Sequence, residues 1–92
     1  MQFGVEDVIV ALSNHNVKLL VVNDDLPLVV SQQRIYNLGG DISLFGERDE
    51  LLLIEYLLEI ALKENIELVV VQSSHVKYAI GQFGGFYSVD RY

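Results

Sequence analysis

Two short runs of β-branched and leucine residues most constrain how this chain can fold. They occupy residues 17–22 and 66–71, and neither contains a proline or a glycine. Near-continuous apolar runs of this kind are typical of strands that are covered on both faces. Each run follows a segment with helical periodicity, so helices and strands alternate along the chain. This order predicts an α/β fold in which helices pack against a small sheet.

Two segments have a clear helical pattern. Residues 5–12 carry apolar side chains at i, i+3, i+4 and i+7, and Asn14-His15-Asn16 ends the helix. Residues 49–63 begin with two acidic residues and end with a lysine, as the helix dipole favours. The polar stripe of this second helix is narrow, and Glu59 and Lys63 are spaced as a favourable pair. We therefore expect the second helix to be buried around most of its circumference.

The remaining elements complete a three-layer α/β/α sandwich with a small mixed sheet. A third helix is predicted over residues 75–83, and residues 86–90 form the last strand. Gly84-Gly85 separates the two, because glycine reaches positive φ without steric cost. Between the first two strands, the arrangement of residues 28–45 around Asn37-Leu38-Gly39-Gly40 predicts a β-hairpin insertion or a loop with strand character. We expect residues 1–92 to form a single domain.

Composition excludes several classes of protein. The chain has 92 residues, of which 51% are hydrophobic, so a packed core is expected. It contains no cysteine, which removes disulfides, thiolate zinc sites and thiol nucleophiles. The apolar runs are too short to span a bilayer, and no signal-peptide pattern is present at the start. These observations predict a soluble, cytoplasmic domain without a cofactor.

The charge balance disfavours nucleic acid as a direct partner. Thirteen acidic residues against six basic ones give a net charge of −7, and the basic residues are scattered along the sequence. A nucleic-acid-binding protein needs a concentrated cationic surface to neutralise phosphates. An acidic field of this kind steers a basic protein partner instead.

The two ends of the chain carry a resemblance to a known family. The chain closes with a double glycine, an apolar strand and Arg91-Tyr92, and it opens with Phe3-Gly4 before an acidic-apolar helix. Residues 17–26 continue this match as a strand that ends in polar and acidic residues, and Ser73-Ser74-His75 follows the next strand. The chain resembles the C-terminal domain of archaeal and eukaryotic class-1 peptide chain release factors and of Pelota.

This resemblance implies a function in translation termination or ribosome rescue. It implies a non-catalytic interaction domain that docks a translational GTPase, with the ribosome-recycling ATPase as a further candidate partner. The residues that the resemblance places in the contact region are Phe83, Phe86, Tyr87 and Arg91. No cofactor and no enzymatic activity are expected.

Three alternative hypotheses stay open at the level of sequence. The same fold occurs in ribosomal proteins that bind kink-turn RNA, but Glu6 and Val10 stand where those proteins place asparagine and lysine. The apolar helix at residues 49–63 is compatible with a self-associating structural module that forms homo-oligomers. Asp24 and Asp25 could hold Mg²⁺ at the end of a strand, although an ordinary polar turn is the favoured interpretation.

Overall fold

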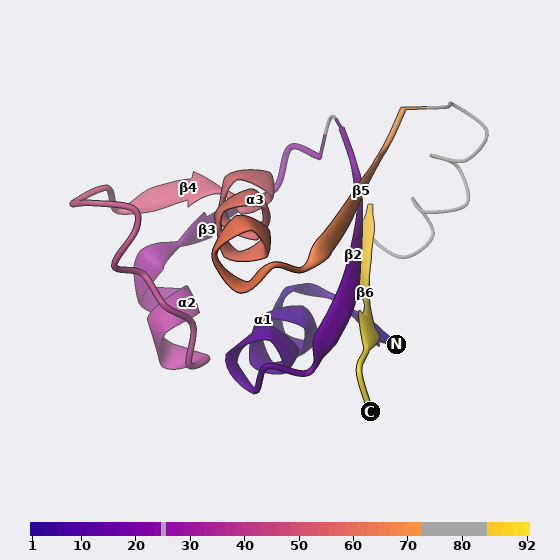
Figure 1. Ribbon diagram of the computed structural model, residues 1–92. Coiled ribbons are helices and arrows are strands. Elements are labelled where there is room, and N and C mark those ends of the chain that lie inside the picture. The colour runs from indigo at the N-terminus through magenta and orange to yellow at the C-terminus, as the bar shows by residue number, and fades with distance from the viewer. Residues whose placement is uncertain (25, 73–84) are drawn as a thin grey trace.

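A four-stranded mixed sheet forms the centre of the computed structural model, which describes residues 1–24, 26–72 and 85–92 (Figure 1). The strand order is β1-β6-β2-β5; β2 runs parallel to β5, and β6 runs antiparallel to both β1 and β2. The strands are β1 (Gln2–Phe3), β2 (Val17–Asn23), β5 (Glu67–Val71) and β6 (Phe86–Asp90). The predicted α/β class and mixed sheet are confirmed, and the three strands predicted from sequence are found within one residue of their expected bounds.

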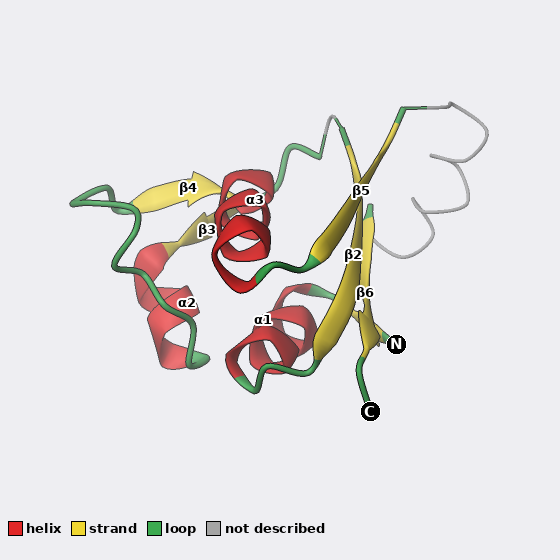
Figure 2. Ribbon diagram, in the orientation of Figure 1, coloured by secondary structure: helices red, strands yellow, loops and turns green. Residues whose placement is uncertain are grey.

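Two helices cover one face of this sheet, as Figure 2 shows. They are α1 (Val5–Ser13) and α3 (Leu53–Glu64), and each is amphipathic because its apolar residues recur at helical spacing. Their buried residues pack with Leu20 and Val22 of β2 into one core. The helix predicted over residues 75–83 lies outside the described residues.

Local turns end the elements where the sequence predicts. Helix α1 ends at Ser13, and His15 follows in the left-handed region with a φ of 56°. Gly85 precedes β6 with a φ of 89°, so glycine has the expected role at this position. Pairing of β1 with β6 brings the two ends of the chain together, and the amino group of Met1 lies 3.2 Å from the Asp90 carboxylate.

The hairpin predicted for residues 28–45 is wrong. This segment contains the short strand β3 (Val29–Ser31) and then helix α2 (Gln32–Asn37). Ser31 caps the helix, because its hydroxyl oxygen accepts a hydrogen bond from the Arg34 amide at 3.1 Å. The partner of β3 is instead β4 (Glu50–Leu52), with which it forms a separate antiparallel pair beyond the helices (Figure 1).

Three expectations about the long helix are also wrong. Helix α3 begins at Leu53 instead of Asp49, because residues 50–52 pair with β3. The helix is not buried around most of its circumference, since Leu62 is 79% exposed. Lys63 forms its ion pair with Asp41 of the preceding loop, whereas the sequence predicted Glu59 as its partner.

Candidate functional site

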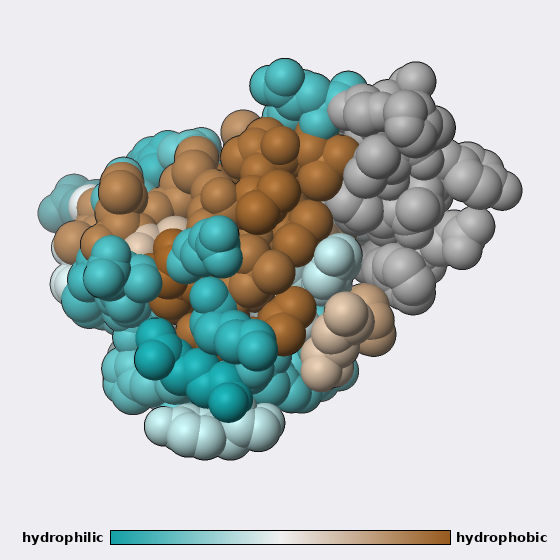
Figure 3. Space-filling model, turned by 45° about the vertical axis from the view of Figure 1, so that its right-hand side comes forward, coloured by the Kyte–Doolittle hydropathy of each residue, from teal (hydrophilic) through white to brown (hydrophobic). Residues whose placement is uncertain are grey.

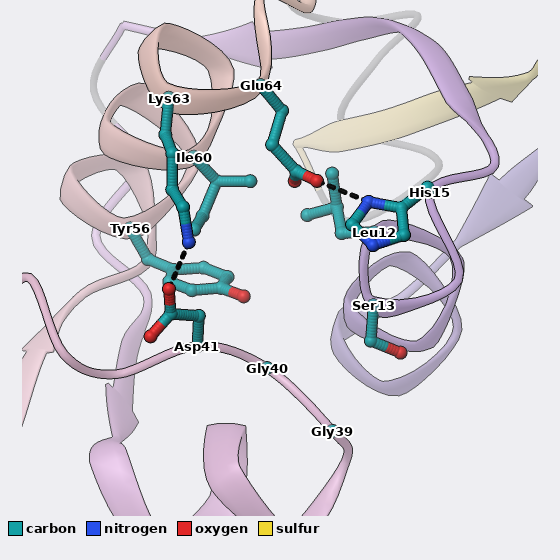
Figure 4. A pocket seen from close by; sticks show the side chains of 10 residues that line it. All are labelled: Leu12, Ser13, His15, Gly39, Gly40, Asp41, Tyr56, Ile60, Lys63 and Glu64. Carbon is teal, nitrogen blue, oxygen red and sulfur yellow. Dashed lines mark hydrogen bonds and ion pairs between the residues drawn. The ribbon is translucent and has the colours of Figure 1, made fainter.

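A pocket of about 160 Å³ opens where α1, α3 and the loop after α2 meet (Figure 4). Helix α1 and its following turn supply one wall, residues 39–41 supply the second, and α3 supplies the third. The lining side chains that carry polar or charged groups are Ser13, His15, Asp41, Tyr56, Lys63 and Glu64. They come from distant parts of the sequence, so the site depends on the tertiary fold.

Two side-chain contacts tie the walls of this pocket together. Nδ1 of His15 lies 2.5 Å from Oε1 of Glu64 and connects the turn after α1 to the end of α3. Lys63 contacts the Asp41 carboxylate, and the hydrogen bond between them holds the pKa of Asp41 well below its usual range and raises the pKa of Lys63. Lys63 and Asp41 therefore neutralise each other, which favours a structural role for this pair over acid–base catalysis.

Tyr56 forms the floor of the pocket. The residue is buried, and its ring lies 5.7 Å from that of Phe45. Burial raises the pKa of Tyr56 to about 12, with a smaller contribution from the negative charges of Glu64 and Asp41. A phenol that keeps its proton at neutral pH cannot act as a general base there.

Gly40 is required for the close approach of the loop to Tyr56. A Cβ atom at this position would lie 2.4 Å from Cγ2 of Ile35 and 2.7 Å from the Tyr56 hydroxyl. Gly40→Ala is therefore expected to destabilise the fold by about 1–3 kcal/mol, as overpacking of cores does. Urea unfolding measures this cost. In a Tyr56→Phe background the cost should be smaller, because the clash with the hydroxyl is removed; an equal cost in both backgrounds would contradict the proposed contact.

A second hollow of about 310 Å³ adjoins the first and shares Leu12, His15 and Glu64 with it. We call it the C-terminal groove. Its other lining residues are Val17, Ile66, Arg91 and Tyr92. The last two project from the end of β6, so the groove places the end of the described chain beside the ends of α1 and α3.

Hydrogen bonds to Asn16 and Val17 hold Arg91 in this groove. Its amide donates to the side-chain oxygen of Asn16 at 3.1 Å, and its Nε donates to the Val17 carbonyl at 3.1 Å. Tyr92 donates its amide to the same Asn16 oxygen, while its side chain is 98% exposed. An anchored arginine and an exposed tyrosine are residue types that are enriched in protein interfaces.

The other three predicted contact residues are Phe83, Phe86 and Tyr87, and none of them is found in the C-terminal groove in the described part of the chain. Phe86 is 2% exposed and belongs to the core, so the prediction that it contacts a partner needs correction: its side chain points toward the helices. Tyr87 is half-buried, its ring lies 6.1 Å from that of Phe3, and it does not line the C-terminal groove. Phe83 lies outside the described residues. Of the three residues that the structure describes, Arg91 alone lines the groove.

Sequence reasoning missed His15 and Glu64 as parts of the site. His15 was interpreted only as a turn residue, and its partner stands 49 positions later in the chain. A histidine with positive φ directly after a helix is a weak local signal, and no spacing in the sequence connects it to Glu64.

The structure describes one of the two candidate magnesium ligands, Asp24. Asp24 follows β2, and its amide donates to the Val71 carbonyl at 3.2 Å. Asp25 lies outside the described residues. Among residues 1–24, 26–72 and 85–92, no three histidine, cysteine or acidic side chains gather as a metal-ion site. Within the same ranges, no helix is long and apolar enough to cross a membrane.

Comparison with solved structures identifies the fold. The C-terminal domain of a peptide chain release factor from Methanosarcina mazei matches with a TM-score of 0.64 and 19% identity, over 98% of this chain and 68% of that chain. The fold is that of a release-factor C-terminal domain. An archaeal translation termination factor matches with a TM-score of 0.59 and 20% identity, over 98% of this chain. No model of a protein family and no curated protein matches the sequence.

The chain spans 19% of the length of that archaeal factor. The likeness to release factors therefore concerns the architecture of one domain. The resemblance to Pelota and the comparison with kink-turn-binding proteins stay predictions from sequence.

Proposed function

We propose that this chain is a non-catalytic docking domain of a translation termination or ribosome-rescue factor. The observation that carries the proposal is the match of 98% of the chain to the C-terminal domain of a release factor. In this proposal the partner is a translational GTPase, with the ribosome-recycling ATPase as a second partner, and the domain acts in the cytoplasm. The net charge of −7 favours a protein partner over RNA.

The C-terminal groove is the surface that best suits such docking. Its hollow can accept a side chain of the partner, and Arg91 and Tyr92 supply a cation and an aromatic ring at its rim. Interfaces concentrate binding energy in arginine and tyrosine residues that become desolvated on binding. The contact of His15 with Glu64 supports the groove, because it connects the two helix ends that form its wall.

Arg91→Glu is expected to weaken binding to an archaeal elongation-factor-type GTPase by at least about tenfold. The change reverses the charge at the groove and removes the contact of Nε with Val17, while the backbone bonds to Asn16 can remain. Isothermal titration calorimetry with the purified GTPase, loaded with a non-hydrolysable GTP analogue or with GDP, measures the effect.

Arg48→Glu provides a matched control. It makes the same change of charge at a residue that pairs with Glu55 and lines neither the first pocket nor the C-terminal groove. The proposal predicts nearly unchanged affinity for this variant. Absence of binding by the wild-type chain in every nucleotide state of the GTPase would count against the docking function itself.

A further inference from the structure

The hydroxyl of Tyr56 is a buried polar group that the fold leaves without a hydrogen bond. The residue is only 1% exposed, and among the described residues its hydroxyl has no hydrogen-bond partner. Figure 4 shows this hydroxyl pointing from α3 into the first pocket, toward the α1 wall. Buried polar groups are normally hydrogen-bonded, so the orientation of Tyr56 points to a ligand that enters the pocket.

The other polar atoms that remain open in the pocket are mainly acceptors. Ser13 donates its hydroxyl proton to the Val10 carbonyl at 2.8 Å, so its oxygen can only accept a bond from a ligand. Nδ1 of His15 contacts Oε1 of Glu64, which leaves the second carboxylate oxygen of Glu64 open. A neutral imidazole that donates from Nδ1 also keeps an acceptor lone pair on Nε2. The pocket is therefore suited to a ligand that donates hydrogen bonds.

The charge of the pocket favours a cationic donor. Among the described residues of the lining, Asp41 and Glu64 are acidic, and Lys63 already contacts Asp41. With His15 neutral, the carboxylate of Glu64 leaves the pocket with a negative charge. The charges of Glu64 and Asp41 oppose ionisation of Tyr56, and the same field repels an anionic ligand.

We infer that this pocket binds an alkylammonium group, which is a protonated primary amine on a short hydrocarbon chain. Its N–H donors match the oxygens of Tyr56, Ser13 and Glu64. Its hydrocarbon chain can pack on Leu12 and Ile60, which are the apolar residues of the lining. A cavity of about 150 Å³ holds benzene, so the pocket of about 160 Å³ is large enough for butylammonium, which has fewer heavy atoms. A free amine and a lysine side chain of another protein share this chemistry.

NMR titration of isotope-labelled protein with butylammonium tests the inference. The amide signals of Gly39, Gly40 and Lys63 are expected to shift and to saturate. Butanol lacks the charge and butyrate carries the opposite one, so each should bind at least about tenfold more weakly. The surface also has a broad apolar area (Figure 3), and signals resolved by residue separate binding in the pocket from apolar contacts there.

Two variants test the contacts, each with a matched control. Glu64→Gln keeps the shape of the side chain and removes its charge, so it should weaken binding of butylammonium by at least about tenfold. Tyr56→Phe keeps the ring and removes the hydroxyl, and the loss should be at least about threefold. Glu59→Gln and Tyr36→Phe make the same changes outside the lining and should leave the affinity unchanged.

The source of the ammonium group is distinguished by comparing diaminobutane with N-acetyl-lysinamide. Tighter binding of diaminobutane indicates a free diamine, and tighter binding of the lysine derivative indicates a side chain of a protein. Absence of signal changes with butylammonium at high millimolar concentration would overturn the inference, as would equally tight binding of butyrate. Unchanged affinity in both Glu64→Gln and Tyr56→Phe would overturn it as well, because the amine would then bind elsewhere.

This inference goes beyond the docking function and can fail separately from it. Tyr56 lines the first pocket but not the C-terminal groove, so Tyr56→Phe should still bind the GTPase. Arg91 lines the groove but not the first pocket, so Arg91→Glu should still bind butylammonium.

Discussion

Phe86→Ala is expected to lower the free energy of unfolding by about 3–5 kcal/mol, the usual cost of truncating a buried aromatic side chain. Phe86 stands on β6, opposite Val22 of β2, and its ring belongs to the core beneath the helices. Because small domains are stable by about 5–15 kcal/mol, the variant should be close to unfolding. Urea denaturation followed by circular dichroism measures the loss.

Phe86→Leu is the matched control for this prediction. It keeps most of the apolar volume and should cost under about 1.5 kcal/mol. If Phe86→Ala instead retained full stability and lost only its affinity for a GTPase, the ring would be a contact residue after all. Stability and binding must therefore be measured on the same variant.

Stability is expected to fall by roughly 2 kcal/mol between pH 10 and pH 12 because of Tyr56. Its pKa is about 12 in the folded protein and about 10 in the unfolded chain. Below pH 10 both states hold the phenol proton, and the stabilising effect is fully present. As pH rises toward 12 the unfolded chain loses this proton first, which favours unfolding.

Tyr56→Phe isolates this effect. The variant has no phenol at this position, so its stability should depend less on pH over the same interval, as measured by urea unfolding at several pH values. Loss of the Lys63 charge weakens the pair with Asp41 in both proteins and cancels in the comparison. An identical decline in the wild type and the variant would show that Tyr56 is not the cause.

The elements that sequence predicted well are those with a strong local pattern. The strand at residues 17–22 and the helix at residues 5–12 appear almost as expected. The first is a near-continuous apolar run, and the second has helical spacing throughout. Residues 28–52 were misread because β3 and β4 have three residues each and pair across a long loop. A strand of three residues gives too short an alternation to recognise, and the cap at Ser31 was missed.

The candidate site could be predicted only at Arg91. Its neighbours in the groove are His15 and Glu64, which the tertiary fold brings together from the ends of α1 and α3. No spacing within the sequence predicts this contact. The family resemblance places Phe86 and Tyr87 in one contact region with Arg91. Successive side chains of a strand point to opposite faces, however, and this alternation sends Phe86 into the core.

The position of β6 in the sheet has a consequence for the order in which the chain folds. Strand β6 lies between β1 and β2, although it follows both by more than half of the chain. During synthesis, β1 and β2 therefore cannot belong to one sheet until residues 86–90 have left the ribosome. Contacts between such distant segments slow folding, because the intervening chain must be ordered first. The helices α1 and α3 can form earlier, so the partly made chain leaves the edge of β2 that pairs with β6 open until residues 86–90 arrive.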